Sequence, residues 1–160
     1  MLFRSDNYLF FQNENEKPVV VNGIEPKSWA LDQANCRLWV TSRSIDSGLQ
    51  SFQFGKLLSQ IEYEGEIVSD FERGNFFTRS STGKLQMRSF AGEVMEEVVS
   101  ANTPFVQKVV WGEGSQFWSL NKGQLNSGRD SLGLTNFKMT GEVLKNIEIE
   151  AGREIGRAHV

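Results

Sequence analysis

The chain has 160 residues, of which 39% are hydrophobic and 23% are charged, proportions that are ordinary for a globular protein with its own core. Its formal net charge of −3 gives no electrostatic reason to expect a nucleic acid or an anionic membrane as a partner. The single cysteine, Cys36, excludes an internal disulfide, and no apolar run approaches the about 20 residues of a membrane-spanning helix. Charge at Arg4 and Asp6 interrupts the start, so we expect no signal peptide and leave the cellular compartment open.

The first segment, residues 1–24, is predicted to contribute strands to a sheet. Leu9–Phe11 and Pro18–Val21 are short apolar stretches on either side of a polar segment, which is the pattern of a β-hairpin. This hairpin loosely matches the second hairpin of a repeat that continues along the chain. The first strand of this copy is missing, so we expect a partial copy here.

Three later segments align with one another without a gap, at residues 29–39, 67–77 and 108–118. Each holds a short apolar stretch, a polar turn and a bulky pair, which predicts a β-hairpin; the pairs are Leu38–Trp39, Phe76–Phe77 and Phe117–Trp118. Asp32 and Asp70 share one position, where an aspartate side chain can brace the turn, and Trp111 replaces them in the third copy. We expect the recurring tryptophans, Trp29 among them, to lie in the core.

A second predicted hairpin follows each of these, over residues 49–61, 85–98 and 134–147. Its turn is held by a glycine, which adopts a positive φ at little cost; these are Gly55, Gly92 and Gly141. Four strands at a spacing of about 40 residues, repeated in tandem, predict an all-β fold, a partial β-propeller of about three and a half four-stranded antiparallel blades. We place a partial blade at 1–24 and blades at 25–63, 64–103 and 104–152. A β-sandwich of short strands is the alternative.

One blade carries a family resemblance. Pro26–Asp32 and Leu38–Ser42 resemble the strand pair of NHL-type, YVTN-type and gluconolactonase-like propellers, in which a Pro-x-x-apolar-Ala-x-Asp strand precedes a Leu-Trp/Tyr-Val strand. The full motif is absent from the other copies. The resemblance implies a parent with six or seven blades, and the members of these families include both binding scaffolds and lactonases.

The last residues break the repeat. Ile155–Val160 is the translation of ATCGGAAGAGCACACGTC, which resembles the start of a common sequencing adapter. We therefore expect residues 153–160 to be a non-native tail, and we assign no catalytic or metal-binding role to the single histidine, His159. With the repeat interrupted at both ends, we expect the chain to be a fragment of a larger propeller.

The candidate binding face follows from the alternating direction of strands in a blade, which puts the loop between the second and third strands on the same face as the link to the next blade. A basic residue recurs just after the second strand, and together these residues predict an anion-attracting collar: Arg4, Arg43, Arg79 and Lys122. In the other interpretation each basic residue braces a neighbouring blade through backbone carbonyls. Glu25 and Asn102 lie on predicted links of this face, where a lactonase-like enzyme would need metal ligands.

These patterns favour a binding or scaffold protein with no catalytic residues, no cofactor and no metal of its own, and with a protein or a small anionic ligand as its partner. The alternative is part of a metal-dependent lactonase-like hydrolase, and an adhesive repeat of a secreted or surface protein is a third possibility. An arc of blades leaves apolar flanks and strand edges uncovered. We therefore also expect self-association through those flanks.

Overall fold

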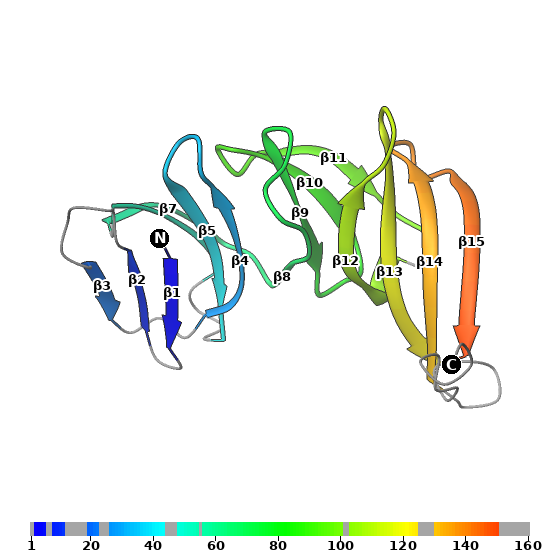
Figure 1. The fold of residues 1–160 in the computed structure, drawn as a ribbon, viewed down its shortest axis with the longest axis horizontal. Helices are drawn as coiled ribbons and strands as arrows, with labels where there is room; N and C mark the ends of the chain where they lie inside the picture. Colours follow the sequence, from blue (N-terminus) through cyan, green and yellow to red (C-terminus); the bar gives the residue numbers. More distant parts are fainter. Residues whose placement is uncertain are drawn as a thin grey trace, which may run out of the picture.

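The computed structural model is an all-β arrangement in which antiparallel sheets follow one another along the chain (Figure 1). It describes residues 2–5, 8–11, 19–22, 26–43, 48–54, 56–100, 103–124 and 130–150, and the side chains of 26–43, 48–54, 56–100, 103–123 and 132–148. The predicted tail, residues 153–160, lies outside this part. No helix within it is long and apolar enough to cross a membrane.

The described strands form four sheets, and in each the spatial order of the strands follows the chain. The N-terminal sheet holds β1 (Leu2–Ser5), β2 (Tyr8–Phe11) and β3 (Val19–Asn22). Sheet I holds β4 (Pro26–Asp32), β5 (Arg37–Ser42), β6 (Leu49–Gln53) and β7 (Lys56–Ile61). Sheet II holds β8 (Gly65–Ile67), β9 (Asn75–Ser80), β10 (Leu85–Ser89) and β11 (Val94–Val98). After a 3-10 turn, η2 (Thr103–Phe105), sheet III holds β12 (Val106–Trp111), β13 (Gln116–Gln124), β14 (Asp130–Lys138) and β15 (Val143–Glu150).

The three complete sheets repeat one another in detail. Each has a register shift at the same point of its third strand, before Phe52, Arg88 and Phe137 respectively. A β-bulge of this kind bends the strand and increases its twist close to the turn. The turn glycines Gly92 and Gly141 have φ of 85° and 90°, as the sequence predicts, and Gly55 lies outside the described residues.

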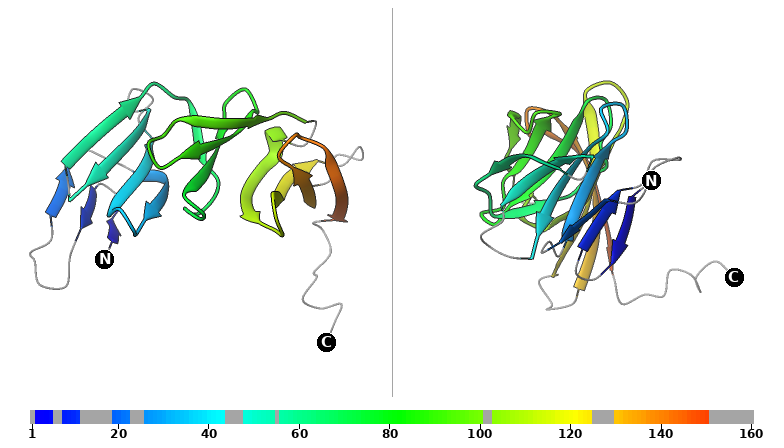
Figure 2. Two further views of the ribbon diagram at one scale, coloured as in Figure 1. Left: turned by 90° about the horizontal axis from the view of Figure 1, so that it is seen from above. Right: turned by 90° about the vertical axis from the view of Figure 1, so that its left-hand side faces the viewer.

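The complete sheets stand side by side as blades along an arc (Figure 2). The first strands of sheets II and III meet in parallel, where the Val109 amide donates to the Val68 carbonyl over 2.7 Å. Sheets I and II are joined by the Ile67 amide, which donates to Ser28 Oγ over 2.8 Å. The chain is therefore a partial β-propeller. The alternative of a β-sandwich is wrong, because a sandwich packs its strands into two sheets lying face to face. The blade boundaries predicted from the sequence stay predictions.

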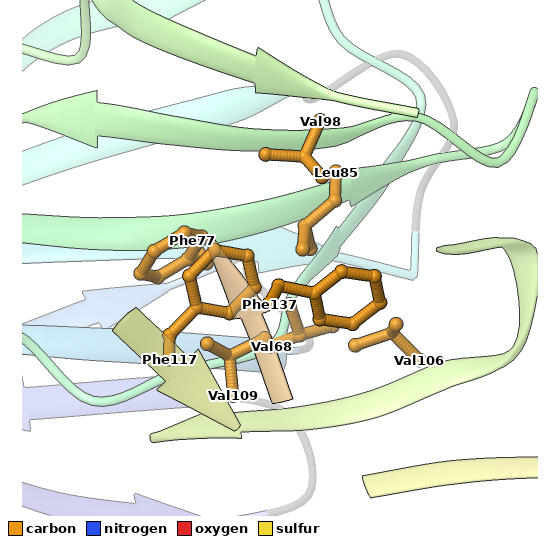
Figure 3. Close-up of a cluster of buried hydrophobic side chains, with 8 residues drawn as sticks. All are labelled: Val68, Phe77, Leu85, Val98, Val106, Val109, Phe117 and Phe137. Atoms are coloured by element: carbon orange, nitrogen blue, oxygen red, sulfur yellow. The ribbon is translucent and has the colours of Figure 1, made fainter. Parts of the chain in front are cut away.

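The core lies between the blades rather than inside any one of them. Side chains of a strand alternate between its two faces, so the two members of a bulky pair point in opposite directions. In sheet II, Phe76 stacks on Trp39 of sheet I at 5.4 Å between ring centroids, and Phe77 meets Phe117 of sheet III at 5.1 Å (Figure 3). The bulky pair of sheet II thus joins this blade to both of its complete neighbours. Trp29, expected in the core, is instead 38% exposed.

The turn of the first hairpin is stabilised differently from one blade to the next. Asp32 is buried and braces the turn as predicted, since it accepts from the Asn35 amide at 3.2 Å. Asp70 does not; its side chain is 87% exposed and pairs with Lys108 of sheet III. In sheet II the bracing oxygen is Ser69 Oγ, which accepts from the Phe77 amide at 2.7 Å.

The third turn is longer than a gapless alignment allows, because Trp111 pairs with Phe117, whereas Asp32 pairs with Arg37. Trp111 therefore faces sheet II, where its ring meets Phe77 edge-on at 5.5 Å.

Candidate functional site

Two neighbouring hollows lie where the loops after the second strands meet the links between blades. One, of about 210 Å³, is lined by residues that include Thr41, Ser42 and Arg43 from the end of β5 and the residues after it. The other, of about 450 Å³, is lined by Arg79–Gly83, by the link residues Pro104 and Phe105, and by Gln107 and Lys122. Both hollows share Lys27, Glu64 and Gly65. We call the two together the basic face.

The structure brings three of the six predicted site residues to this face: Arg43, Arg79 and Lys122 line it. Arg4 lies on β1, and its side chain is outside the described part. Glu25 and Asn102 are outside it altogether. These three residues come one from each complete blade, and the collar itself stays a prediction.

Arg79 braces the neighbouring blade. Its guanidinium donates to the Val106 carbonyl at the start of sheet III, and it pairs with Glu66 of its own sheet at 3.3 Å. Only 16% of the side chain is exposed. This contact matches the second interpretation of the recurring basic residues, in which they hold the blades together.

Glu66 and Lys27 were not singled out in the sequence as partners, yet they complete this contact. The Lys27 ammonium lies 3.0 Å from Glu66 Oε1, so one carboxylate receives a cation from sheet I and another from sheet II. Lys27, Glu66, Arg79 and the Val106 carbonyl therefore link three consecutive blades. No local motif marks these residues, because the pairing depends on how the first strands of adjacent blades align.

The loop after β9 is hydrogen-bonded to the link before sheet II and lies against the link that follows sheet II. Ser81 donates its amide to the Glu64 carbonyl at 2.8 Å, and Ser80 Oγ accepts from the Lys84 amide at 3.0 Å. Gly83 has a φ of 84°, and a Cβ there would lie 2.7 Å from Pro104 Cγ. A larger residue at Gly83 would clash with Pro104, so the close approach of the loop to the link depends on this glycine.

The basic face carries an excess of positive charge. Lys27, Arg43, Arg79 and Lys122 line it together with two acidic residues, Glu64 and Glu66, whereas the whole chain has a net charge of −3. Hydroxyl groups of Ser42, Ser81 and Thr82 stand among these charges. Cations and hydroxyls in a concave surface are groups that hold a small anion.

Elsewhere on the described part of the chain, a hollow of about 560 Å³ lies at the hairpin turns of sheets I and II; its lining includes Trp29, Asp32, Asp70, Phe71 and Arg73. Arg73 contacts the next blade: it donates to the Gly114 carbonyl at 2.8 Å and lies 5.0 Å from the centre of the Trp111 ring. Among the described residues no three His, Cys, Asp or Glu side chains are grouped so that they could hold a metal ion.

No protein-family model matches the sequence, and no curated protein matches it. The fold is similar to that of several solved structures. One of them is the crystal structure of the eukaryotic initiation factor. Its sequence is 6% identical to this chain, and the match has a TM-score of 0.54 and covers 92% of this chain and 40% of that one. The WD40 β-propeller domain of Doa1 is 15% identical, with a TM-score of 0.46, over 94% of this chain and 64% of that one. BamB from Moraxella catarrhalis is 13% identical to this chain, with a TM-score of 0.47, over 94% of this chain and 62% of that one. This chain therefore spans less than two thirds of the length of each.

Proposed function

We propose that this chain is a propeller binding scaffold and that its basic face holds a small anionic ligand. The excess of basic over acidic residues around the two hollows carries the proposal, because it runs against the net charge of the whole chain. Arg79 and Lys27 are paired with Glu66, which fixes the geometry of the face, while Arg43 lines one hollow and Lys122 lines the other.

A titration with inorganic phosphate tests the proposal, with the ionic strength held constant by sodium chloride and binding followed by calorimetry. Arg43→Glu and Lys122→Glu should each weaken phosphate binding about tenfold or more, which corresponds to about 1.4 kcal/mol. Arg79 is unsuitable for charge reversal because it also joins sheets II and III. Wild-type protein that binds no phosphate would overturn the proposal.

The matched control is Lys56→Glu, which changes the net charge by the same amount on an exposed residue of β7 that lines neither hollow. It should leave the affinity for phosphate unchanged. If it weakens binding as much as the other two variants do, attraction is a property of the overall charge and the basic face is not the site.

The motif at Pro26–Asp32 and Leu38–Ser42 supports a relationship to NHL-type, YVTN-type or gluconolactonase-like propellers. A lactonase-like hydrolase is the second function that such a relationship allows. It would need oxygen ligands converging on a metal, for which Glu25 and Asn102 are the candidates from the sequence. No contact between described residues favours it over binding.

A further inference from the structure

The larger hollow of the basic face, about 450 Å³ in volume, has one aromatic side chain among the residues that line it. This residue is Phe105, the last residue of η2, and it is 48% exposed. Within the described part of the chain no other aromatic ring stacks on it. A phenyl ring that is half open to a polar hollow gives a bound ligand an apolar surface to cover.

The backbone on both sides of Phe105 is held in place. Thr103 is fully buried, and its hydroxyl donates to the Ser100 carbonyl over 2.9 Å. Val106 is fully buried as well, and its carbonyl accepts a hydrogen bond from Arg79. The ring is therefore presented by a preformed link, and a ligand that covers it does not have to order this segment first.

A lysine stands next to this ring. Val106 pairs with Asn121 across the first two strands of sheet III, so Phe105 and Lys122 are the next residues at the same end, and η2 contacts β13. Lys122 is exposed and forms no ion pair with any residue that the structure describes. Neighbours across an antiparallel pair lie about 5 Å apart, a separation that one small molecule spans.

The smaller hollow differs in both respects. Its aromatic residue is Tyr63, whose hydroxyl is buried and whose ring lies 4.7 Å from the guanidinium of Arg88. Its volume of about 210 Å³ is below the range of about 300–1,000 Å³ that is usual for small-molecule sites, and the larger hollow lies within that range. The larger hollow is therefore the one that combines an accessible ring, a cation and enough room for an organic anion.

We propose that the larger hollow binds a small phosphate monoester that carries an aromatic ring, with the phosphate beside Lys122 and the ring on Phe105. This inference rests on the proposed function, because it names the kind of anion that the basic face holds. The phosphate oxygens accept hydrogen bonds from the lysine and from the hydroxyl groups of Ser81 and Thr82, which line the same hollow. The ring gains the offset or edge-to-face contact that aromatic pairs prefer.

Three probes of equal charge separate the contact of the phosphate from the contact of the ring. Methyl phosphate, phenyl phosphate and adenosine monophosphate are compared by calorimetry at about pH 8, where each is a dianion because the second pKa of a phosphate monoester is about 6. The wild-type chain should bind at least one ring-bearing probe about threefold to tenfold more tightly than methyl phosphate, the size expected for one aromatic contact. The tighter of the two ring-bearing probes identifies the source of the ring, an aryl ester or a nucleotide.

Variants of Phe105 test whether this ring makes the contact. Phe105→Ala should reduce the affinity for the ring-bearing probes to that for methyl phosphate, and Phe105→Tyr, which keeps a ring, should keep the preference. Phe54→Ala is the matched control, since Phe54 is 53% exposed and lines neither hollow. It should leave the preference as it is in the wild type. Far-ultraviolet circular dichroism shows that each variant folds.

The proposed function and this inference fail in different ways. Wild-type protein that binds no inorganic phosphate would overturn the proposed function and this inference with it. Wild-type protein that binds inorganic phosphate but shows no preference for either ring-bearing probe would overturn this inference alone. A preference that survives in Phe105→Ala would also overturn it, because the ring would then lie elsewhere.

Discussion

The two interfaces between complete blades are built from the same strand positions, but they bury different kinds of side chain there. Arg88 in sheet II and Phe137 in sheet III are equivalent, because each follows the bulge of the third strand and pairs with the first member of the bulky pair, Phe76 or Phe117. Both point toward the preceding blade, and both are buried, at 5% and 0% exposure. One repeat position therefore holds a cation in one interface and a phenyl ring in the other.

Between sheets I and II, the cation is surrounded by partners. Arg88 donates to the Gly92 carbonyl at 2.8 Å and to Thr78 Oγ1 at 3.0 Å, and its guanidinium lies 4.7 Å from the centre of the Tyr63 ring. A guanidinium needs several acceptors at once when water is excluded. The turn and the strand of its own blade supply them, and the link residue Tyr63 supplies the ring.

Between sheets II and III, the buried groups are apolar and neutral. Phe137 stacks on Phe117 at 5.2 Å, and Phe117 meets Phe77 at 5.1 Å. The polar side chains of this interface satisfy one another, as where Asn121 Nδ2 donates to Thr135 Oγ1 at 2.8 Å. The comparison teaches that the repeat fixes which position is buried, and that neighbouring acceptors decide whether the position can be charged.

Phe137→Arg is the change expected to have the largest effect, because it puts a cation where the surroundings are aromatic rings. It should lower the free energy of unfolding by about 4 kcal/mol or more, measured by urea unfolding followed by circular dichroism. Phe137→Leu, which keeps the site apolar, should cost about 1–2 kcal/mol. Equal losses for the two variants would show that shape alone matters at this position.

Arg88→Ala is the intermediate case. It removes the donors to Gly92 and Thr78 and leaves a cavity over Tyr63, so we expect a loss of about 2–4 kcal/mol in the same urea experiment. Arg88→Phe restores the residue type of the other blades and fills the cavity, while the two acceptors stay unsatisfied. Arg88→Phe should lower the free energy of unfolding less than Arg88→Ala does. A larger decrease would mean that the hydrogen bonds of Arg88 contribute more than its packing.

The smallest effect is expected at high pH, from Tyr63. Burial raises the pKa of this phenol above its ordinary value of 10.0, and the positive charge of Arg88 offsets part of the rise. The unfolded chain therefore releases this proton at a lower pH than the folded chain does, and the free energy of unfolding falls as the pH rises above that value. The contribution of the protonated Tyr63 to the free energy of unfolding is fully present below pH 10 and is lost as the pH rises through the raised pKa.

Tyr63→Phe removes that titration. The difference in urea stability between wild type and variant should be constant below pH 10 and should shift in favour of the variant above it. A difference that stays flat through pH 11 would contradict the burial of an ionisable phenol at this position.

Much of the fold could be predicted from the sequence, because the blade is a local unit. The hairpins, the turn glycines Gly92 and Gly141 and the bulky pairs follow from patterns within about 40 residues. The predicted turn role of Asp70 failed because Lys108, from the next blade, pairs with the carboxylate while Ser69 takes over the turn. A contact between blades is invisible to an alignment of single blades.

Of the candidate site, the sequence supplied the recurring basic residues and the face on which they stand. It could not show that Arg79 holds the Val106 carbonyl or that Glu66 lies between Lys27 and Arg79. Those contacts depend on the stagger between the first strands of adjacent sheets, which no spacing within one blade encodes.

The sequence by itself determined a repeated four-stranded unit, its hairpins and the bulky pairs at the repeat positions. Strand alternation and turn chemistry are local, so they can be deduced from order along the chain. Only the tertiary structure decided which buried position carries a charge and which cations join blades. These depend on groups that are far apart in the sequence and meet only when one blade packs against the next.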